Sequence, residues 1–161
     1  MTDGLQVVRV TPERVGLVAP LFDAYRRFYG QPPDPEGARR FLSDRLGQGE
    51  SVVFAVTEGE HALGFTQLYP SFSSVSMKPL WVLNDLFVAE PARRRGVGAR
   101  LLGAAKDHAA RTGAARLVLS TAVDNFTAQA LYERLGWQKD TAFVHYKFEL
   151  PADSGPEGGA G

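Results

Sequence analysis

An arginine- and glycine-rich turn is the strongest candidate for binding an anion. Its six residues, 93–98 (RRRGVG), lie between a strand-like run at 81–88 and a helix-like run at 99–111. The first turn of a helix carries unpaired backbone N–H groups and the positive end of the helix dipole. Glycines let the backbone approach an anion closely, and arginines add charged, fork-shaped donors. The sequence therefore predicts a diphosphate site at the start of this helix.

Two other phosphate-binding motifs do not fit this turn. A P-loop needs a lysine followed by serine or threonine after its last glycine, whereas Ala99 and Arg100 follow here. The dinucleotide fingerprint needs three glycines after the first strand of a Rossmann unit, but this turn comes late in the chain and has only Gly96 and Gly98.

A second segment, residues 125–137, is typical of a capped helix that ends in glycine. Asn125 precedes it, Tyr132 lies near its end and Gly136 follows. Seven residues along a helix bring Asn125 and Tyr132 to one face about 10 Å apart, a span that suits one extended ligand.

The elements that must position these segments alternate along the chain. From residue 81 onward the order is βαβαβ, so we expect part of the sheet to be parallel. The serine-rich stretch 70–77 is predicted to be a loop. Patterning and cap signals predict strands at 5–10, 51–57, 61–69, 81–88, 116–121 and 141–150, and helices at 11–30, 35–46, 98–111 and 125–135.

Composition limits the class of protein. With 161 residues and 44% hydrophobic content, the chain suits a single domain, 1–150, followed by a disordered tail, 151–161. The formal net charge is zero, so no overall field favours nucleic acid or an anionic membrane. The absence of cysteine excludes disulfides, thiolate catalysis and cysteine metal sites. No stretch is long enough to span a bilayer and no signal peptide is present, so we expect a cytoplasmic protein.

Together the two motifs and the element order resemble the GNAT superfamily of acetyl-CoA-dependent N-acetyltransferases. The family's acyl-CoA signature is similar to residues 85–98, and its second motif is similar to residues 125–136. The resemblance implies an α/β fold of the α+β type: one mixed sheet of six to seven strands, about four flanking helices, and a splayed pair of parallel central strands. It also implies a small-amine or histone-type acetyltransferase branch.

The resemblance implies acetyl-CoA as co-substrate and assigns its contacts. The backbone N–H groups of the arginine turn would hold the pyrophosphate, and the strand before it would pair with the pantetheine arm. Asn125 and Ala128 would lie near that arm, and Tyr132 near the thioester sulfur. The cofactor-binding residues expected are Leu86, Phe87, Val88, Arg93, Arg94, Arg95, Gly96, Val97, Gly98, Ala99, Asn125, Ala128 and Tyr132.

The implied reaction is direct attack of a neutral amine on the acetyl thioester in a ternary complex, with no metal required. Tyr132 is the expected general acid for the leaving sulfur, and Asp85 the expected base, acting through water. Similar polyamine-type enzymes carry a carboxylate one position earlier, where this chain has Asn84. Each of these assignments has an alternative interpretation. The arginine turn would then be a solvated basic turn, Tyr132 a core tyrosine and Asp85 a structural carboxylate.

The acceptor site is expected where the family's variable contacts lie, on the early helices and the loop before residue 81. The same residues are alternative candidates for the interface of a homodimer. The acceptor-site candidates are Tyr25, Tyr29, Asp34, Tyr69, Ser71, Phe72 and Asn84.

The resemblance narrows the acceptor to a primary amine. The first hypothesis is a small-molecule N-acetyltransferase acting on a polyamine, an amino acid or a related amine. The alternatives are a protein lysine or N-terminal acetyltransferase, and a non-catalytic acyl-CoA-binding sensor.

Overall fold

The structure is a computed structural model that describes residues 4–152. It divides into two compact units, Met1–Phe126 and Thr127–Gly161, and each is described by itself. Most of the predicted tail, residues 153–161, lies outside the described residues. No helix in the described part of the chain is both long and apolar enough to cross a lipid bilayer.

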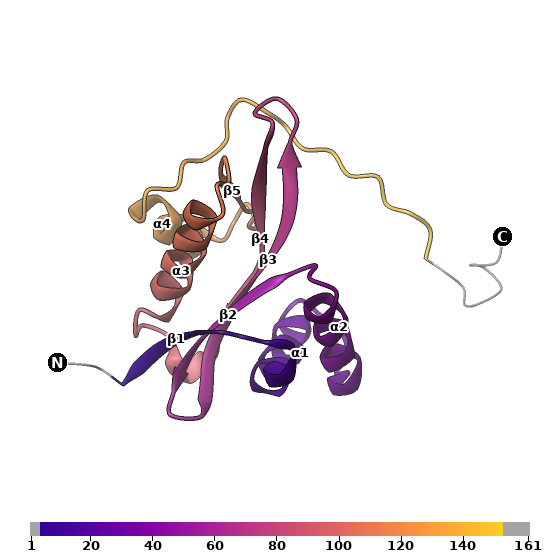
Figure 1. Ribbon diagram of the computed structural model, residues 1–161, viewed down its shortest axis with the longest axis vertical. Helices are drawn as coiled ribbons and strands as arrows, with labels where there is room; N and C mark the ends of the chain where they lie inside the picture. The colour runs from indigo at the N-terminus through magenta and orange to yellow at the C-terminus, as the bar shows by residue number, and fades with distance from the viewer. Residues whose placement is uncertain (1–3, 153–161) are drawn as a thin grey trace. The chain divides into compact units, whose positions relative to one another are not determined.

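The first unit is built on a five-stranded sheet with the strand order β1-β2-β3-β4-β5 (Figure 1). Neighbouring strands are antiparallel except β4 and β5, which are parallel as the alternating pattern predicts. The predicted mixed α+β fold is confirmed, with five strands among residues 4–152 where six to seven were expected. The strands are β1 (Leu5–Arg9), β2 (Val52–Glu58), β3 (His61–Ser73), β4 (Lys78–Val88) and β5 (Leu117–Val118).

Four segments differ from the prediction. The single helix expected at 11–30 is a 3-10 helix, Pro12–Leu17, followed by an α-helix, Ala19–Phe28. The serine-rich stretch was expected to be a loop, but β3 continues to Ser73, which pairs with Lys78 of β4. Cross-strand pairing here outweighs the weak strand preference of serine and proline. The strand expected at 116–121 shortens to Leu117–Val118, and residues 141–150 form no strand and are exposed. Alternation of polar and apolar residues indicates that a segment can form a strand. A strand also needs a neighbouring strand to pair with, and the alternation does not show whether one is present.

Helices cover both faces of the sheet, so β2 is buried on both sides. Val53 and Ala55 belong to the core shared with the first two helices, whereas Phe54 points to the other face and contacts His108 of α3. The helices of the first unit are η1 (Pro12–Leu17), α1 (Ala19–Phe28), α2 (Pro35–Gly47), η2 (Glu90–Ala92) and α3 (Val97–Arg111).

A buried carboxylate fixes the connection between α1 and α2. Asp23 is only 4% exposed, and its Oδ1 accepts a 2.9 Å hydrogen bond from the backbone N–H of Asp34. The Asp34 side chain in turn accepts from the N–H of Gly37 at 3.0 Å and caps α2. This is the cap followed by proline that the sequence predicts at residues 34–35.

A glycine on β3 allows α3 to lie close to the sheet. A Cβ at Gly64 would lie 2.9 Å from the carbonyl oxygen of Phe87 and 2.9 Å from a Val97 methyl group. It would also lie 3.4 Å from a methyl group of Leu101. The first turns of α3 therefore depend on the missing side chain at residue 64.

The helix of the second motif, α4 (Phe126–Arg134), ends as its sequence predicts. Gly136 has φ 95°, and the N–H of Trp137 donates to the carbonyl of Tyr132 at 2.9 Å. This hydrogen bond and the left-handed glycine form a Schellman-type end. The Tyr132 ring lies 6.0 Å from the ring of Trp137.

Candidate active site

The arginine turn ends in an uncapped helix start. Gly96 is the N-cap residue of α3, with φ 76°, and no side chain caps the helix there. Arg94 also has a positive φ, 68°. Because the N–H groups of the first helical turn have no intrahelical acceptor, this end of α3 is suited to receive an anion. The structure thus retains the strand–turn–helix context on which the predicted diphosphate site depends.

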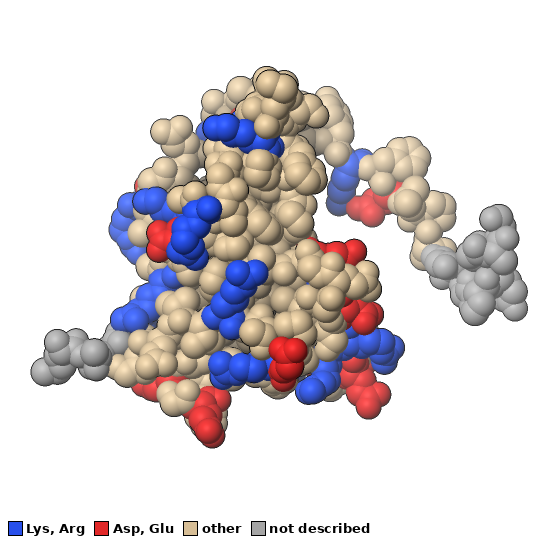
Figure 2. All heavy atoms as spheres, viewed as in Figure 1, with Lys and Arg blue, Asp and Glu red and all other residues tan. Residues whose placement is uncertain are grey.

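The arginine side chains of the turn contact the protein itself. Arg93 Nε donates to the carbonyl of Val88 at 3.2 Å, and Arg95 makes a two-pronged ion pair with Glu58 at 2.7 and 3.2 Å. Both interactions fasten the turn to the sheet. On the face shown in Figure 2, several basic side chains, with an acidic neighbour among them, lie on the side where Figure 1 draws α3.

The strand before the turn has one edge without a partner strand. On one side, Leu86, Phe87 and Val88 pair with β3. On the other side, the pairing of β4 with β5 stops at Val82, so among the described residues β5 does not continue alongside the end of β4. A strand edge of this kind can pair with an extended ligand through its backbone groups.

A bulge in β4 places two polar side chains at one cavity. Gln67 pairs with Asp85 but the next residue, Leu68, pairs with Leu83, which leaves Asn84 as an extra residue on β4. Bulges re-aim side chains in this way. Asn84 Nδ2 then donates to Asp85 Oδ1 at 3.1 Å, and both side chains line the same cavity.

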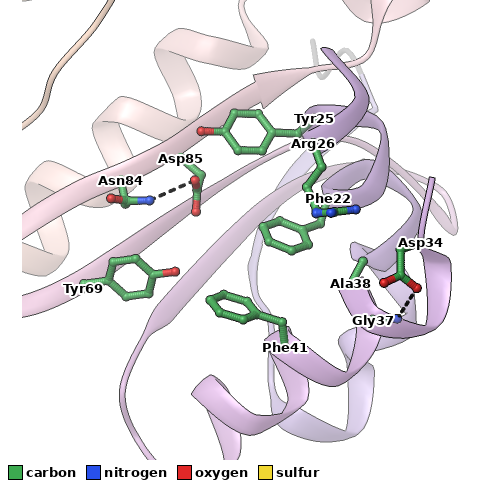
Figure 3. Close-up of a pocket in the computed structure, with 10 residues that line it drawn as sticks. All are labelled: Phe22, Tyr25, Arg26, Asp34, Gly37, Ala38, Phe41, Tyr69, Asn84 and Asp85. Atoms are coloured by element: carbon green, nitrogen blue, oxygen red, sulfur yellow. Dashed lines mark hydrogen bonds between the residues drawn. The ribbon is translucent and has the colours of Figure 1, made fainter. Parts of the chain in front are cut away.

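This cavity, here called the α1–β4 cavity, has a volume of about 380 Å³. Figure 3 shows aromatic rings from α1, α2 and β3 around the Asp85 carboxylate. Its size and mixed lining are those of a small-molecule site. It is lined by Phe22, Tyr25, Arg26, Asp34, Gly37, Ala38, Phe41, Tyr69, Asn84 and Asp85.

Asp85 is buried and held from several sides. Its side chain accepts a 2.7 Å hydrogen bond from Gln67 Nε2 in addition to that from Asn84, and its backbone carbonyl accepts from the Thr66 hydroxyl at 2.8 Å. The residue is 4% exposed. These bonds fix the carboxylate and compensate for its burial.

The Asp85 carboxylate also contributes to the raised pKa values of two phenols in the cavity. Burial, the charge of Asp85 and hydrogen bonding to it raise the pKa of Tyr25 well above its ordinary value. Burial and the Asp85 charge raise the pKa of Tyr69 to about 12. Both phenols therefore remain protonated near neutral pH and are available as hydrogen-bond donors in the cavity.

The structure brings together five of the predicted substrate and catalytic residues. Three other candidates do not line the cavity: Phe72 is 78% exposed, Ser71 lies beside it on β3, and Tyr29 is 62% exposed with its ring 5.1 Å from that of Tyr25. The residues that line the cavity are Tyr25, Asp34, Tyr69, Asn84 and Asp85.

Sequence reasoning missed Phe22, Arg26 and Phe41 as cavity residues. Phe22, Tyr25 and Arg26 follow the i, i+3, i+4 spacing of one helical face, so the early aromatic cluster carried the signal for the α1 side. Phe41 stacks on Phe22 with ring centroids 5.8 Å apart, which depends on how α1 and α2 pack.

The expected cofactor residues of the second motif lie at the boundary of the two units or beyond it. Asn125 precedes α4, and Ala128 and Tyr132 lie within the helix, with Tyr132 partly buried. Their roles stay predictions. Among residues 4–152, no group of three or more His, Asp or Glu side chains is arranged to hold a metal ion.

Comparison with known proteins places this geometry in a family. Residues 18–137 match the model of the acetyltransferase (GNAT) family. The chain is 53% identical over 135 residues to an uncharacterized N-acetyltransferase, YhfO, of Bacillus subtilis (strain 168), covering 84% of this chain and 91% of that protein. It is 33% identical over 106 residues to the L-ornithine N5-acetyltransferase NATA1 of Arabidopsis thaliana, covering 66% of this chain and 40% of that protein.

A solved structure agrees with both results. The crystal structure of a probable acetyltransferase has a TM-score of 0.86 and 46% identity, covering 91% of this chain and 99% of that one. The chain is therefore an N-acetyltransferase that belongs to the GNAT family, whose members use acetyl-CoA.

Proposed function

We propose that this enzyme transfers the acetyl group of acetyl-CoA to a primary amine of a small molecule that binds in the α1–β4 cavity. The observation that carries the proposal is the buried Asp85 carboxylate, which faces this cavity from the strand that leads into the arginine turn. A cavity of about 380 Å³ suits a small acceptor. The ornithine acetyltransferase of Arabidopsis thaliana, whose name states a small amine substrate, supports the same class.

The residues present fit acetyl-CoA. The uncapped N-terminus of α3, with Gly96 in the left-handed region, would hold the pyrophosphate through backbone N–H groups. The edge of β4 at residues 86–88 would hold the pantetheine arm. When bound, acetyl-CoA supplies the acetyl group as a thioester.

Asp85 is the proposed general base. A primary amine has a pKa near 10, so it arrives as an ammonium ion that a fixed carboxylate attracts. Asp85 accepts a proton from it, directly or through water, while Gln67 and Asn84 hold the carboxylate in place. The phenol oxygens of Tyr25 and Tyr69 accept hydrogen bonds from the ammonium group and orient it, while their protons remain available to donate to the carboxylate. Tyr132 remains the proposed general acid for the leaving thiolate.

The proposal is tested by measuring thiol release from acetyl-CoA with diamines, amino acids, aminoglycosides and histone peptides. We expect turnover with small amines and little with peptides. Asp85→Asn is expected to lower kcat/KM by about 10² to 10⁴, the usual contribution of a positioned base. Tyr132→Phe is expected to lower kcat with little change in acetyl-CoA affinity. Preference for a peptide would favour the protein acetyltransferase, and binding of acetyl-CoA without turnover of any amine would favour the sensor.

A further inference from the structure

The α1–β4 cavity has charged side chains on two opposite walls. Asp85 and Asn84 lie on the strand side, whereas Arg26 of α1 and Asp34 at the start of α2 lie on the helical side, with Phe22 between them (Figure 3). The charged groups of the lining are thus one guanidinium and two carboxylates. A ligand that complements them carries two ammonium groups and one carboxylate.

Arg26 is held in place through Nη1, and its other nitrogen atoms keep N–H donors that a ligand can use. Its Nη1 donates to Asp23 Oδ1 at 3.3 Å and to the carbonyl of Pro32 at 3.2 Å. Among the described residues, Nε and Nη2 make no hydrogen bond, and the side chain is 26% exposed. Nε and Nη2 form one edge of the guanidinium, which is the edge that binds a carboxylate through two parallel hydrogen bonds.

Asp34 provides a second charged group on the helical side of the cavity. One of its carboxylate oxygens caps α2 through Gly37, and the residue lines the cavity. A negative charge on the same side of the cavity as the guanidinium suits an ammonium group bonded close to a carboxylate, which is the arrangement in the backbone of a free α-amino acid.

We propose that the acceptor is a free amino acid whose side chain carries the reacting primary amine, with its carboxylate on Arg26, its α-ammonium near Asp34 and its side-chain amine at Asp85. This inference rests on the proposed function and names its substrate class. The methylene groups of such a side chain would lie against Phe22, which lies between the two charged walls, and against the neighbouring ring of Tyr25. A diamine without a carboxylate would leave the Arg26 edge unpaired, which disfavours its binding.

The experiment compares matched pairs of acceptors that differ only in the carboxylate: L-ornithine with putrescine, and L-lysine with cadaverine. We expect kcat/KM of the wild-type enzyme to be at least about tenfold higher for the amino acid of each pair, the value of one charged hydrogen-bonded contact. Arg26→Gln is expected to remove this preference by lowering the amino acid value without lowering the diamine value, because a guanidinium repels a second ammonium group. Arg26→Lys, which keeps the charge but not the planar edge, is expected to keep part of it.

Arg27→Gln is the matched control. Arg27 also pairs with Asp23, at 3.5 Å, but its side chain is 50% exposed and does not line the cavity. The substitution should leave the ratio of amino acid to diamine unchanged. Melting temperatures of both variants report any loosening of the α1–α2 connection.

Binding of L-ornithine in the presence of coenzyme A, measured by calorimetry, separates this inference from the proposed function. Binding that Arg26→Gln weakens at least about tenfold supports the assignment of Arg26 even without turnover, and would then contradict only the proposed reaction. Equal or better use of the diamines by the wild-type enzyme would overturn the inference and leave the proposed reaction standing. An equal loss for both members of a pair in Arg26→Gln would also overturn it, because the role of Arg26 would then be structural.

Discussion

Replacing Gly64 with alanine tests whether α3 depends on close contact with β3. The new Cβ would meet the Phe87 carbonyl oxygen and a Val97 methyl group, each at 2.9 Å. An outward shift of α3 can relieve the contact with Val97, but the Phe87 oxygen belongs to the backbone of β4 and can move only if the pairing of β3 with β4 is distorted. Overpacking of this kind costs about 1–3 kcal/mol of unfolding free energy.

For a chain of this size the expected loss corresponds to about 2–4 °C in Tm for each kcal/mol. Gly103→Ala is the control on the same helix, since a Cβ there has no atom within 4 Å. It should stabilise the protein by about 0.5–1 kcal/mol through helix propensity. Thermal and urea unfolding measure both variants. A Gly64→Ala protein as stable as wild type would show that the contact between α3 and β3 is not as close as described.

Further predictions concern three other sites. Tyr69 ionises near pH 12 when folded and near pH 10 when unfolded, so we expect it to contribute about 1–2 kcal/mol to the stability that wild type loses between these pH values. Tyr69→Phe should lose less than wild type by about that amount, as measured by urea unfolding. Burial and, to a smaller extent, two neighbouring arginines lower the pKa of His108. The unfolded chain therefore binds a proton at this histidine before the folded protein does, so stability should fall as the pH drops below 6.5. His108→Leu should reduce that fall, as measured by thermal unfolding. Glu58→Gln, which breaks the exposed pair with Arg95, should cost less than about 1 kcal/mol, and salt should diminish the difference.

Local chemistry was sufficient to predict the elements that carry their own start and stop signals. Asp34 followed by proline begins α2, Gly96 begins α3, and Gly136 ends α4, each through cap and turn preferences that can be recognised from adjacent residues. The buried run of β2 and the hairpin at residues 58–61 are recognisable for the same reason.

Features that depend on partners distant in sequence could not be predicted in this way. The bulge at Asn84, which puts Asn84 and Asp85 at one cavity, arises from the register between β3 and β4. The presence of Arg26 in that cavity depends on how α1 lies over the sheet, and the extension of β3 to Ser73 depends on its pairing with Lys78. Residues 141–150 have strand-like alternation, yet they have no strand partner among the described residues.

The measurement that tests the cofactor site most directly is calorimetric titration of acetyl-CoA into the wild-type protein, Gly96→Glu and Gly113→Glu. Both glycines have φ above 70° and no atom within 4 Å of a new Cβ, so the two variants share the same backbone strain and the same added charge. They lie at opposite ends of α3, about 22 Å apart along its 15 residues. We predict that wild type and Gly113→Glu bind acetyl-CoA alike, and that Gly96→Glu loses most of its affinity because a carboxylate then faces the pyrophosphate. Equal affinity in all three proteins would contradict the assignment of the pyrophosphate to the start of α3.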